Sequence, residues 1–307
     1  MIPILLIGFR RPAETRRVIN HLVSHNINTI YVAMDGPRDS AEVSLTAQAR
    51  CACKEAIPTN INARYLFSDT NLGVQYFPPA AIDWFFTHEE YGLIIEDDVL
   101  IHRDFLIFAD HYLKDGKAAV VSASLFAHVQ STQFDMKPFK TPIISVWGWG
   151  TTSATWFAYR QSRLEFSSPL RVMRQLIGTV TAPQALVFAM CLHYISIGKL
   201  KTWDYQFAYY LLRNQILTIY PPVNMAENIG NSAGAMNCAE DEVLSLPMSN
   251  KRIIIEYPEM IDICINKSYS STQALNSLLT KQHLWYAVKG LIKYTIDSAT
   301  SYLRAGR

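Results

Sequence analysis

The stretch Gly92-Leu93-Ile94-Ile95-Glu96-Asp97-Asp98-Val99 is the feature around which the chain is organised. Its apolar part is typical of a buried strand, and it ends abruptly in three carboxylates. Such a cluster is costly in a globular protein unless positive charge lies against it. Mg²⁺ and Mn²⁺ suit carboxylate oxygens and are commonly held by one or two of them together with substrate phosphates. The stretch therefore indicates either a nucleoside-diphosphate site or acids that begin a helix near Phe105.

Composition narrows the class of protein. Of the 307 residues, 50% are hydrophobic and 18% are charged, which predicts a large core in one domain or two joined halves. A net charge of +2 is too small for a nucleic-acid partner. The five cysteines are scattered, without a CxxC pair or a histidine spaced for zinc, and they fit buried thiols in a reducing compartment: Cys51, Cys53, Cys191, Cys238 and Cys264.

No apolar stretch predicts a membrane anchor. Met1–Phe9 is only one strand long and lacks a basic n-region, so it does not fit a signal peptide. The longest apolar stretch, Ala182–Ile197, is interrupted by Gln184 and His193 and predicts a buried helix. We therefore expect a cytoplasmic protein.

Strands and helices alternate through the first third of the chain. Near-continuous aliphatic runs predict strands buried on both faces, and helical spacing of apolar residues predicts the segments between them. The expected order is a strand over 2–8, a helix through 18–23, a strand over 29–34, a helix over 43–56, a strand over 63–67, a helix over 79–88 and the acidic strand. This order predicts a mostly parallel α/β sheet with right-handed crossovers and helices on both faces.

Polar residues follow these strands at one edge of the predicted sheet. In an open parallel sheet the ligand crevice lies beyond the carboxyl ends of the strands, which is where Arg10, Arg11, Asp35, Gly36, Glu96, Asp97 and Asp98 fall. The alternatives are an ordinary turn at Asp35-Gly36 and a solvated charge at Arg10. Because the chain has neither a GxGxxG nor a GxxxxGK[ST] sequence, a metal ion must replace the glycine cradle that holds phosphate.

Aromatic residues mark the second half of the chain. Trp147-Gly148-Trp149-Gly150 fits either a platform for a sugar ring or base, or two core side chains. Asp204 stands among Trp203, Tyr205 and Phe207, where a carboxylate tends to have a raised pKa that suits a general base. The alternative for Asp204 is an acid at a helix N-terminus.

The C-terminal segment from His283 has one apolar face and one basic face at helical spacing. Such a helix can lie on an anionic membrane surface, which would make the protein peripheral at the inner face of the cell membrane. It can equally dock on its own domain.

Taken in order, these motifs resemble those of nucleotide-sugar glycosyltransferases with the GT-A fold, most closely bacterial relatives of the N-acetylglucosaminyltransferase I type. The likeness spans about Ile2–Gly234 and rests on the Arg-Pro turn after the first strand, Asp35-Gly36-Pro37, Asn71-Leu72-Gly73, Glu96-Asp97-Asp98, the Trp-Gly-Trp-Gly segment and Trp203-Asp204. It implies a Rossmann-like GT-A sheet with an acceptor-side subregion and a C-terminal helix.

The resemblance also implies roles for single residues. Asp98 would ligate Mn²⁺ or Mg²⁺, and Asp204 would be the catalytic base, although Tyr205 stands where the family often has a second aspartate. The implied donor-binding residues are Arg10, Arg11, Asp35, Gly36, Asn71, Gly73, Glu96 and Asp97, and the implied acceptor-binding residues are Trp147, Trp149 and Trp203.

The sequence thus leads to one main hypothesis. It is an inverting, metal-dependent hexosyl- or N-acetylhexosaminyltransferase that uses a nucleotide-sugar donor, with UDP implied, and a glycan or lipid-linked glycan acceptor in bacterial lipopolysaccharide, O-antigen or capsule synthesis. We expect a nucleotide-binding half at 1–125, an acceptor-binding half at 126–245 and an extension at 246–307. The alternatives are a nucleotidyltransferase of similar fold, a glycoside hydrolase and a non-catalytic sugar-binding protein.

Overall fold

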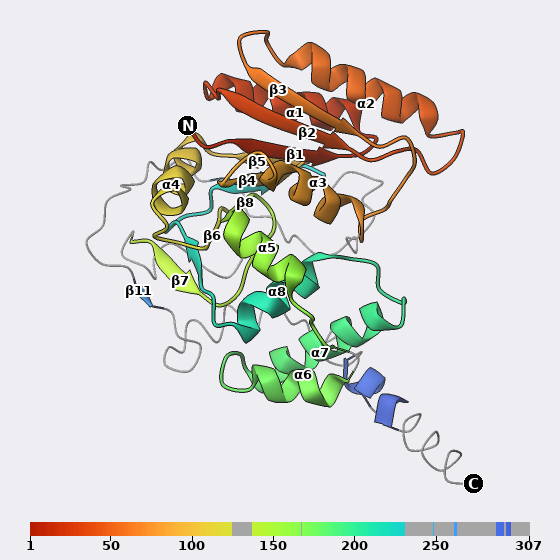
Figure 1. Ribbon diagram of the computed structural model, residues 1–307, viewed down its shortest axis with the longest axis vertical. Coiled ribbons are helices and arrows are strands. Elements are labelled where there is room, and N and C mark those ends of the chain that lie inside the picture. Colours follow the sequence, from red (N-terminus) through yellow and green to blue (C-terminus); the bar gives the residue numbers. More distant parts are fainter. Residues whose placement is uncertain are drawn as a thin grey trace. The chain divides into compact units, whose positions relative to one another are not determined.

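The computed structural model describes residues 1–124, 137–166, 168–230, 248, 261–262, 287–291 and 293–295. Its contacts divide the chain into two compact units (Figure 1). Unit 1 comprises Met1–Gln161 and Ile216–Asp262, and unit 2 comprises Ser162–Gln215 and Ile263–Arg307. The predicted halves at 1–125 and 126–245 are expected within one domain, and strands on both sides of residue 125 belong to one sheet; the roles assigned to these ranges stay predictions.

Within the residues that the structure describes, unit 1 is built on a nine-stranded sheet. Its strands are β1 (Ile4–Gly8), β2 (Thr29–Met34), β3 (Asn62–Phe67), β4 (Tyr91–Glu96), β6 (Val120–Ser122), β7 (Phe139–Thr141), β8 (Trp149–Thr152), β9 (Thr218–Tyr220) and β11 (Ile261–Asp262). They lie in the order β11-β7-β9-β6-β8-β4-β1-β2-β3. The half from β4 to β3 is parallel throughout, whereas β8 runs antiparallel to both β4 and β6. A separate antiparallel pair joins β5 (Val99–Ile101) to β10 (Ala226–Asn228).

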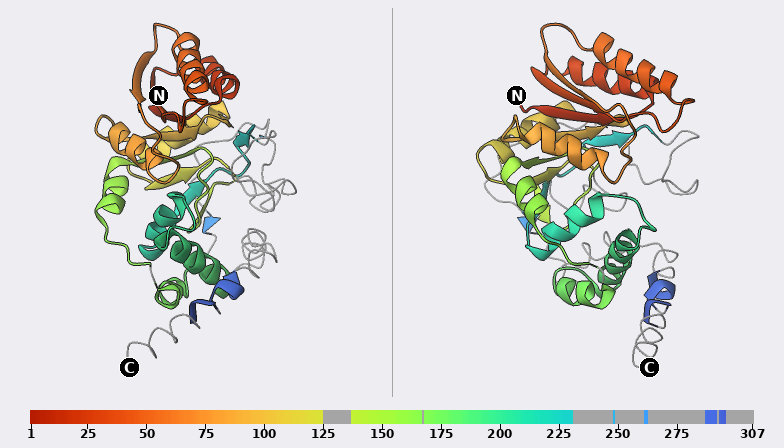
Figure 2. Two further views of the ribbon diagram at one scale, coloured as in Figure 1. Left: turned by 90° about the vertical axis from the view of Figure 1, so that its right-hand side faces the viewer. Right: turned by 45° about the vertical axis from the view of Figure 1, so that its right-hand side comes forward.

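Helices cover both faces of this sheet, as the sequence predicts (Figure 2, left). On one face lie α1 (Pro12–Ser24), α2 (Val43–Ala56) and α4 (Arg103–Lys114), and on the other lie α3 (Phe77–Phe86) and α5 (Ser153–Gln161). The unit is therefore a three-layer α/β structure of the Rossmann-like kind, and the predicted fold class is confirmed at that level.

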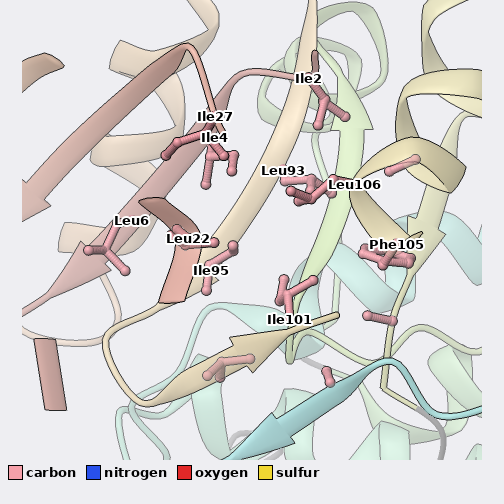
Figure 3. Close-up of a cluster of buried hydrophobic side chains, with 14 of the residues drawn as sticks. Ile2, Ile4, Leu6, Leu22, Ile27, Leu93, Ile95, Ile101, Phe105 and Leu106 are labelled. Carbon is pink, nitrogen blue, oxygen red and sulfur yellow. The ribbon is translucent and has the colours of Figure 1, made fainter. Parts of the chain in front are cut away.

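The larger core lies under α1, α2 and α4, and alternation along the strands explains it. Side chains of a strand point to opposite faces in turn, so Ile4 and Leu6 of β1 share a face with Leu93 and Ile95 of β4. Figure 3 shows these four side chains gathered with Leu22 of α1 and with Phe105 and Leu106 of α4. All of them are almost completely buried, which fixes the register of the two strands against each other.

The opposite face of β4 has almost no space beneath α3. A Cβ atom on Gly92 would lie 2.3 Å from the Phe85 ring and 2.9 Å from the carbonyl oxygen of Pro3. Glycine at the start of the acidic strand is therefore needed for close packing of the helix.

Most predicted elements are confirmed. β2 and α2 have the predicted bounds, and β4 ends at Glu96. Of the Trp147-Gly148-Trp149-Gly150 segment, only the last two residues lie in a strand. Gly148 has φ of +70°, which turns the backbone out of extended geometry, so β8 begins at Trp149.

Unit 2 is helical in the residues that the structure describes, with α6 (Pro169–Leu176), α7 (Ala182–Ser196) and α8 (Asp204–Arg213). The predicted helix over 182–197 is confirmed, and at its start Oε1 of Gln184 accepts a hydrogen bond of 2.9 Å from the N–H of Thr181. None of the described helices combines the length and the apolar character needed to cross a bilayer.

The C-terminal segment packs against α7 where it is described. Residues 287–291 and 293–295 are helical, and Ala287 and Leu291 contact the cluster formed by Leu186 and Met190 of α7. A Cβ atom on Gly290 would lie 2.3 Å from the hydroxyl of Tyr194, so the two helices are close at this glycine. Of the two predicted uses of this helix, docking on its own domain is the one that these contacts support.

Candidate active site

The acidic residues lie at the switch point of the parallel half of the sheet. The chain leaves β1 toward β2 and later returns to β4 on the other side of β1. The loops that follow β1 and β4 therefore diverge, and ligands of open α/β sheets bind in the crevice between such loops. Residues 9–11 follow β1 and residues 97–98 follow β4, so the predicted residues Arg10, Arg11, Asp97 and Asp98 share this position. Glu96 is the last residue of β4 and is paired with Ile7.

Asp97 is buried beneath the first of these loops. Its Oδ2 accepts a hydrogen bond of 3.1 Å from the main-chain N–H of Phe9. Burial raises the pKa of Asp97 to about 7, and the charge of Asp98 adds to the shift. A Cβ atom on Gly8 would lie 2.9 Å from this carboxylate, so glycine at the end of β1 permits the contact. Burial and the neighbouring Asp98 therefore disfavour the charged form of Asp97, which an added cation would favour.

Asp98 lies between two other segments of the chain. Its Oδ2 forms an ion pair with Nη1 of Arg11, and the charges of Asp98 and Asp97 raise the pKa of Arg11 although burial alone would lower it. The carbonyl oxygen of Asp98 accepts a hydrogen bond of 2.7 Å from the N–H of Ile229, just beyond β10. A Cβ atom on Gly230 would lie 2.1 Å from Asp98 Oδ2, so only glycine fits against this carboxylate.

The donor set fits a hard divalent cation. Oδ1 of Asp98 is buried and has no hydrogen-bond partner among the described residues, and the pKa of the adjacent Asp97 is raised by burial although the charge of Arg11 acts to lower it. The described part of the chain brings no three side chains of His, Cys, Asp or Glu together as a metal site. A Mg²⁺ or Mn²⁺ ion here would therefore depend on one or two carboxylates, with phosphate and water as its other ligands.

Arg10 is paired with a residue that the sequence analysis did not single out. Its Nη1 pairs with Glu42, which also binds Arg38. Hydrogen bonds from Arg38 lower the pKa of Glu42 to about 2. The guanidinium groups of Arg10 and Arg38 lie 5.6 and 5.7 Å from the centre of the Phe9 ring. No sequence signal links Glu42 to Arg10, because Glu42 lies in the loop before α2 and its partner is decided by the fold.

The residues predicted near the ends of β2 and β3 form one loop structure around Asp35. Asp35 is 5% exposed and accepts hydrogen bonds from the N–H groups of Gly36 (2.8 Å), Leu72 (2.9 Å) and Gly73 (2.9 Å), and from Nδ2 of Asn71 (3.0 Å). Both carboxylate oxygens of Asp35 are thus used to shape the loop, as in the turn interpretation. A direct contact of Asp35, Gly36, Asn71 or Gly73 with a nucleotide stays a prediction.

Two of the three predicted acceptor platforms are buried. Trp149 is 1% exposed, and its ring lies 6.3 Å from that of Trp156. Trp203, in unit 2, is 4% exposed. Neither offers a face on which a sugar could stack, so the core interpretation replaces the predicted acceptor role. Trp147 is partly buried against the main core and stays a candidate.

Asp204 is the first residue of α8 in unit 2. Its Oδ1 accepts a hydrogen bond from the hydroxyl of Thr202, as suits an acid at a helix N-terminus. Its proposed part as a catalytic base stays a prediction.

Comparisons with known proteins give a distant likeness only. A scan against protein-family models matches none to this chain, and a search of curated proteins finds no match. Among solved structures, HddC from Yersinia pseudotuberculosis shows 9% identity and a TM-score of 0.35 over 54% of this chain and 83% of its own. Its complex with GMP-PN shows 11% identity, the same TM-score and the same coverage.

A third solved structure, named as a glucose-1-phosphate thymidylyltransferase from Bacillus anthracis in complex with a sucrose, shows 11% identity and a TM-score of 0.30. The match covers 52% of this chain and 76% of that one. Similarity at this level does not extend to a function, and it adds nothing to the resemblance to the N-acetylglucosaminyltransferase I type.

Proposed function

We propose that this protein is a metal-dependent transferase that acts on a nucleoside-diphosphate sugar and passes the sugar, with inversion, to a glycan hydroxyl. The observation that carries the proposal is the buried Oδ1 of Asp98, which has no hydrogen-bond partner among the described residues and lies beside Arg11 at the switch point of the sheet. A carboxylate oxygen that can hold a cation, next to a guanidinium that can hold phosphate, fits a diphosphate better than a neutral ligand.

The residues would divide the chemistry as follows. Bound Mg²⁺ or Mn²⁺ would offset the charge that develops on the leaving diphosphate. Asp98 would hold the ion through Oδ1, and Arg11 would donate to phosphate oxygens. Asp204 would take the proton of the acceptor hydroxyl while that oxygen bonds to the anomeric carbon and the bond from this carbon to the diphosphate breaks.

The finer features of the proposal rest on the resemblance alone. They are UDP as the nucleotide, a hexose or N-acetylhexosamine as the sugar, and a surface polysaccharide, free or lipid-linked, as the acceptor. The predicted cytoplasmic location and membrane contact belong with them.

A nucleotidyltransferase is the second candidate, because it would use the same sheet edge. It would join a nucleoside triphosphate to a sugar phosphate and release pyrophosphate, whereas a glycosyltransferase releases a nucleoside diphosphate. The loop after β1 argues against it, because Gly8-Phe9-Arg10-Arg11-Pro12 has one glycine and Pro12 removes a main-chain donor at the start of α1.

The first test is a thermal-shift titration with nucleoside diphosphates, triphosphates and nucleotide sugars, with Mn²⁺ and then with chelator. A ligand at a hundred times its dissociation constant adds about 2.7 kcal/mol to stability. We expect stabilisation by one nucleotide family only with metal, and its loss in Asp98→Asn. Asp115→Asn, which alters an exposed acid at the end of α4, should keep the shift. No shift with any nucleotide would reject the proposal.

The second test is the identity of the released product. Nucleoside diphosphate would support glycosyl transfer, and pyrophosphate would support nucleotidyl transfer. In a glycosyl-transfer assay, Asp204→Ala should lower turnover by about a hundred- to ten-thousandfold, as removal of a general base does, while donor binding is unchanged. Near-normal turnover would remove Asp204 from the mechanism.

A further inference from the structure

Two histidines at the end of α1 converge on one main-chain oxygen. His21 and His25 lie four residues apart, one helical turn, and therefore face the same way. Nε2 of His21 is 2.9 Å from the carbonyl oxygen of Ile101, the last residue of β5, and Nε2 of His25 is 3.1 Å from the same oxygen. The two Nε2 atoms are 3.2 Å apart, and the rings meet edge to face at 4.5 Å.

The tautomers of the two rings decide what holds these three atoms together. A neutral imidazole has one N–H and one bare nitrogen, and a carbonyl oxygen has two lone pairs and only accepts. With hydrogen on both Nε2 atoms, both N–H groups can donate to the carbonyl oxygen of Ile101. With hydrogen on both Nδ1 atoms, three lone-pair donors lie within 3.2 Å of one another, an arrangement that a cation stabilises.

A metal ion above the triangle would satisfy all three atoms together. With metal–nitrogen bonds of about 2.0–2.1 Å, two donors lie about 3.3 Å apart in a tetrahedral site and about 2.9 Å apart at a right angle. The observed sides of 2.9, 3.1 and 3.2 Å fall in this range. Both histidines are only half-buried, so water can reach the site and complete the coordination shell.

The electrostatic surroundings favour neutral imidazole, which is the form that binds metal. Burial and the charge of His21 lower the pKa of His25, with smaller contributions from His102 and Arg103, and together these outweigh the rise caused by its hydrogen bond to Ile101. His102 is itself fixed, because its Nδ1 accepts a hydrogen bond of 3.1 Å from the N–H of Asp104 and caps α4. Imidazole nitrogen selects zinc, copper or nickel over magnesium or manganese.

We propose that His21, His25 and the carbonyl oxygen of Ile101 form a binding site for a divalent transition-metal ion of the zinc class. The site is separate from the hard-cation site at Asp98 and does not depend on it. The site joins α1, which begins directly after Arg11, to β5, which begins directly after Asp98. A bound ion would therefore hold together the two elements that follow the Arg11–Asp98 ion pair. A sequence search for zinc patterns misses the site because its third donor is a main-chain atom.

The test is zinc binding by the full chain, measured by competition with a chromophoric chelator and by thermal melting. We compare the wild type with His21→Gln, His25→Gln and the double variant; His88→Gln, an exposed histidine, is the matched control. The double variant should bind one zinc ion fewer per chain and should lose the zinc-dependent rise in melting temperature. Each single variant should bind at least about tenfold more weakly, the lower bound for loss of supporting groups.

Asp98→Asn should keep the zinc response, which separates this proposal from the proposed function. Equal zinc stoichiometry and an equal melting shift in the wild type and the double variant would overturn it. If the double variant fails to fold, the two single variants decide the matter by the same measurements.

Discussion

The parallel and mixed halves of the sheet in unit 1 use their residues differently. From β4 to β3 the strands have five or six residues and all point the same way, so their carboxyl ends place polar loops at one edge. From β8 to β7 the strands have three or four residues and do not share one direction: β6 and β9 are parallel, whereas β8 runs antiparallel to β6 and β7 runs antiparallel to β9. In the parallel half, polar groups gather at the candidate site. In the mixed half, they are buried among packed side chains. Strand direction, more than composition, therefore decides where chemistry can assemble.

The largest expected effect on stability is that of removing Asp35, the carboxylate to which the loops after β2 and β3 are hydrogen-bonded. Asp35→Ala should lower the free energy of unfolding by about 3 kcal/mol, because it leaves the N–H groups of Leu72 and Gly73 and the amide of Asn71 without their acceptor. Urea unfolding measures the difference. Asp69→Ala, at an exposed position in the same loop, should change it by less than about 0.5 kcal/mol. Equal effects of the two changes would mean that Asp35 does not organise the loop.

The counterpart in the mixed half is one buried hydroxyl. The hydroxyl of Tyr220 accepts from the N–H of Ser145 at 2.8 Å and donates to the carbonyl oxygen of Ile143 at 3.0 Å. Tyr220→Phe should therefore cost about 1–2 kcal/mol by urea unfolding, because both main-chain groups lose their partner. Tyr76→Phe, at a 65% exposed side chain, is the control and should be neutral. A neutral Tyr220→Phe would show that the mixed half does not rely on buried polar contacts.

The sequence predicts the parallel half far better than the mixed half. β2 and α2 match their expected bounds because a continuous apolar run and a helical repeat are local signals. The pairing of β8 with β4 and β6 has no local signal, since it joins residues 149–152 to strands far away in the chain.

The same limit applies to the candidate site. The positions of Asp97 and Asp98 follow from the strand that precedes them, so they could be predicted. The pairing of Arg10 with Glu42 and the burial of Trp149 could not, because residue type alone does not reveal which partner or which face the fold provides.

A smaller effect on stability is expected when the pH is lowered and Glu42 takes up a proton. Hydrogen bonds from Arg38 hold the pKa of Glu42 at about 2, below its ordinary value of 4.5. The unfolded chain therefore takes up this proton first as pH falls, so the stabilisation is complete above about pH 4.5 and is lost toward pH 2. Thermal melts from pH 6 to pH 2 should fall less steeply for Glu42→Gln than for the wild type. If the melting temperatures of the variant and the wild type fell equally with pH, the lowered pKa of Glu42 would be contradicted.

The smallest effect is expected at the ion pair on the surface of the parallel half. Arg16 and Glu55 join α1 to α2 at 2.6 Å, but both side chains are about half exposed. Water and salt screen such pairs, so Arg16→Ala should cost less than about 0.5 kcal/mol by urea unfolding, and less still at high salt. A loss above about 1 kcal/mol would mean that surface charge contributes to joining these helices.

The antiparallel contact between β4 and β8 also affects how the protein can be shortened. β4 has β1 on one side and β8 on the other, and its residues 92–95 are buried. A fragment that ends after α4 would keep the parallel half but would leave the β8 side of β4 as a bare, flat and apolar edge. Edges of this kind pair with other chains. Such a fragment would associate through the strand that precedes the acidic residues, so trimming the protein to its parallel half would favour aggregation.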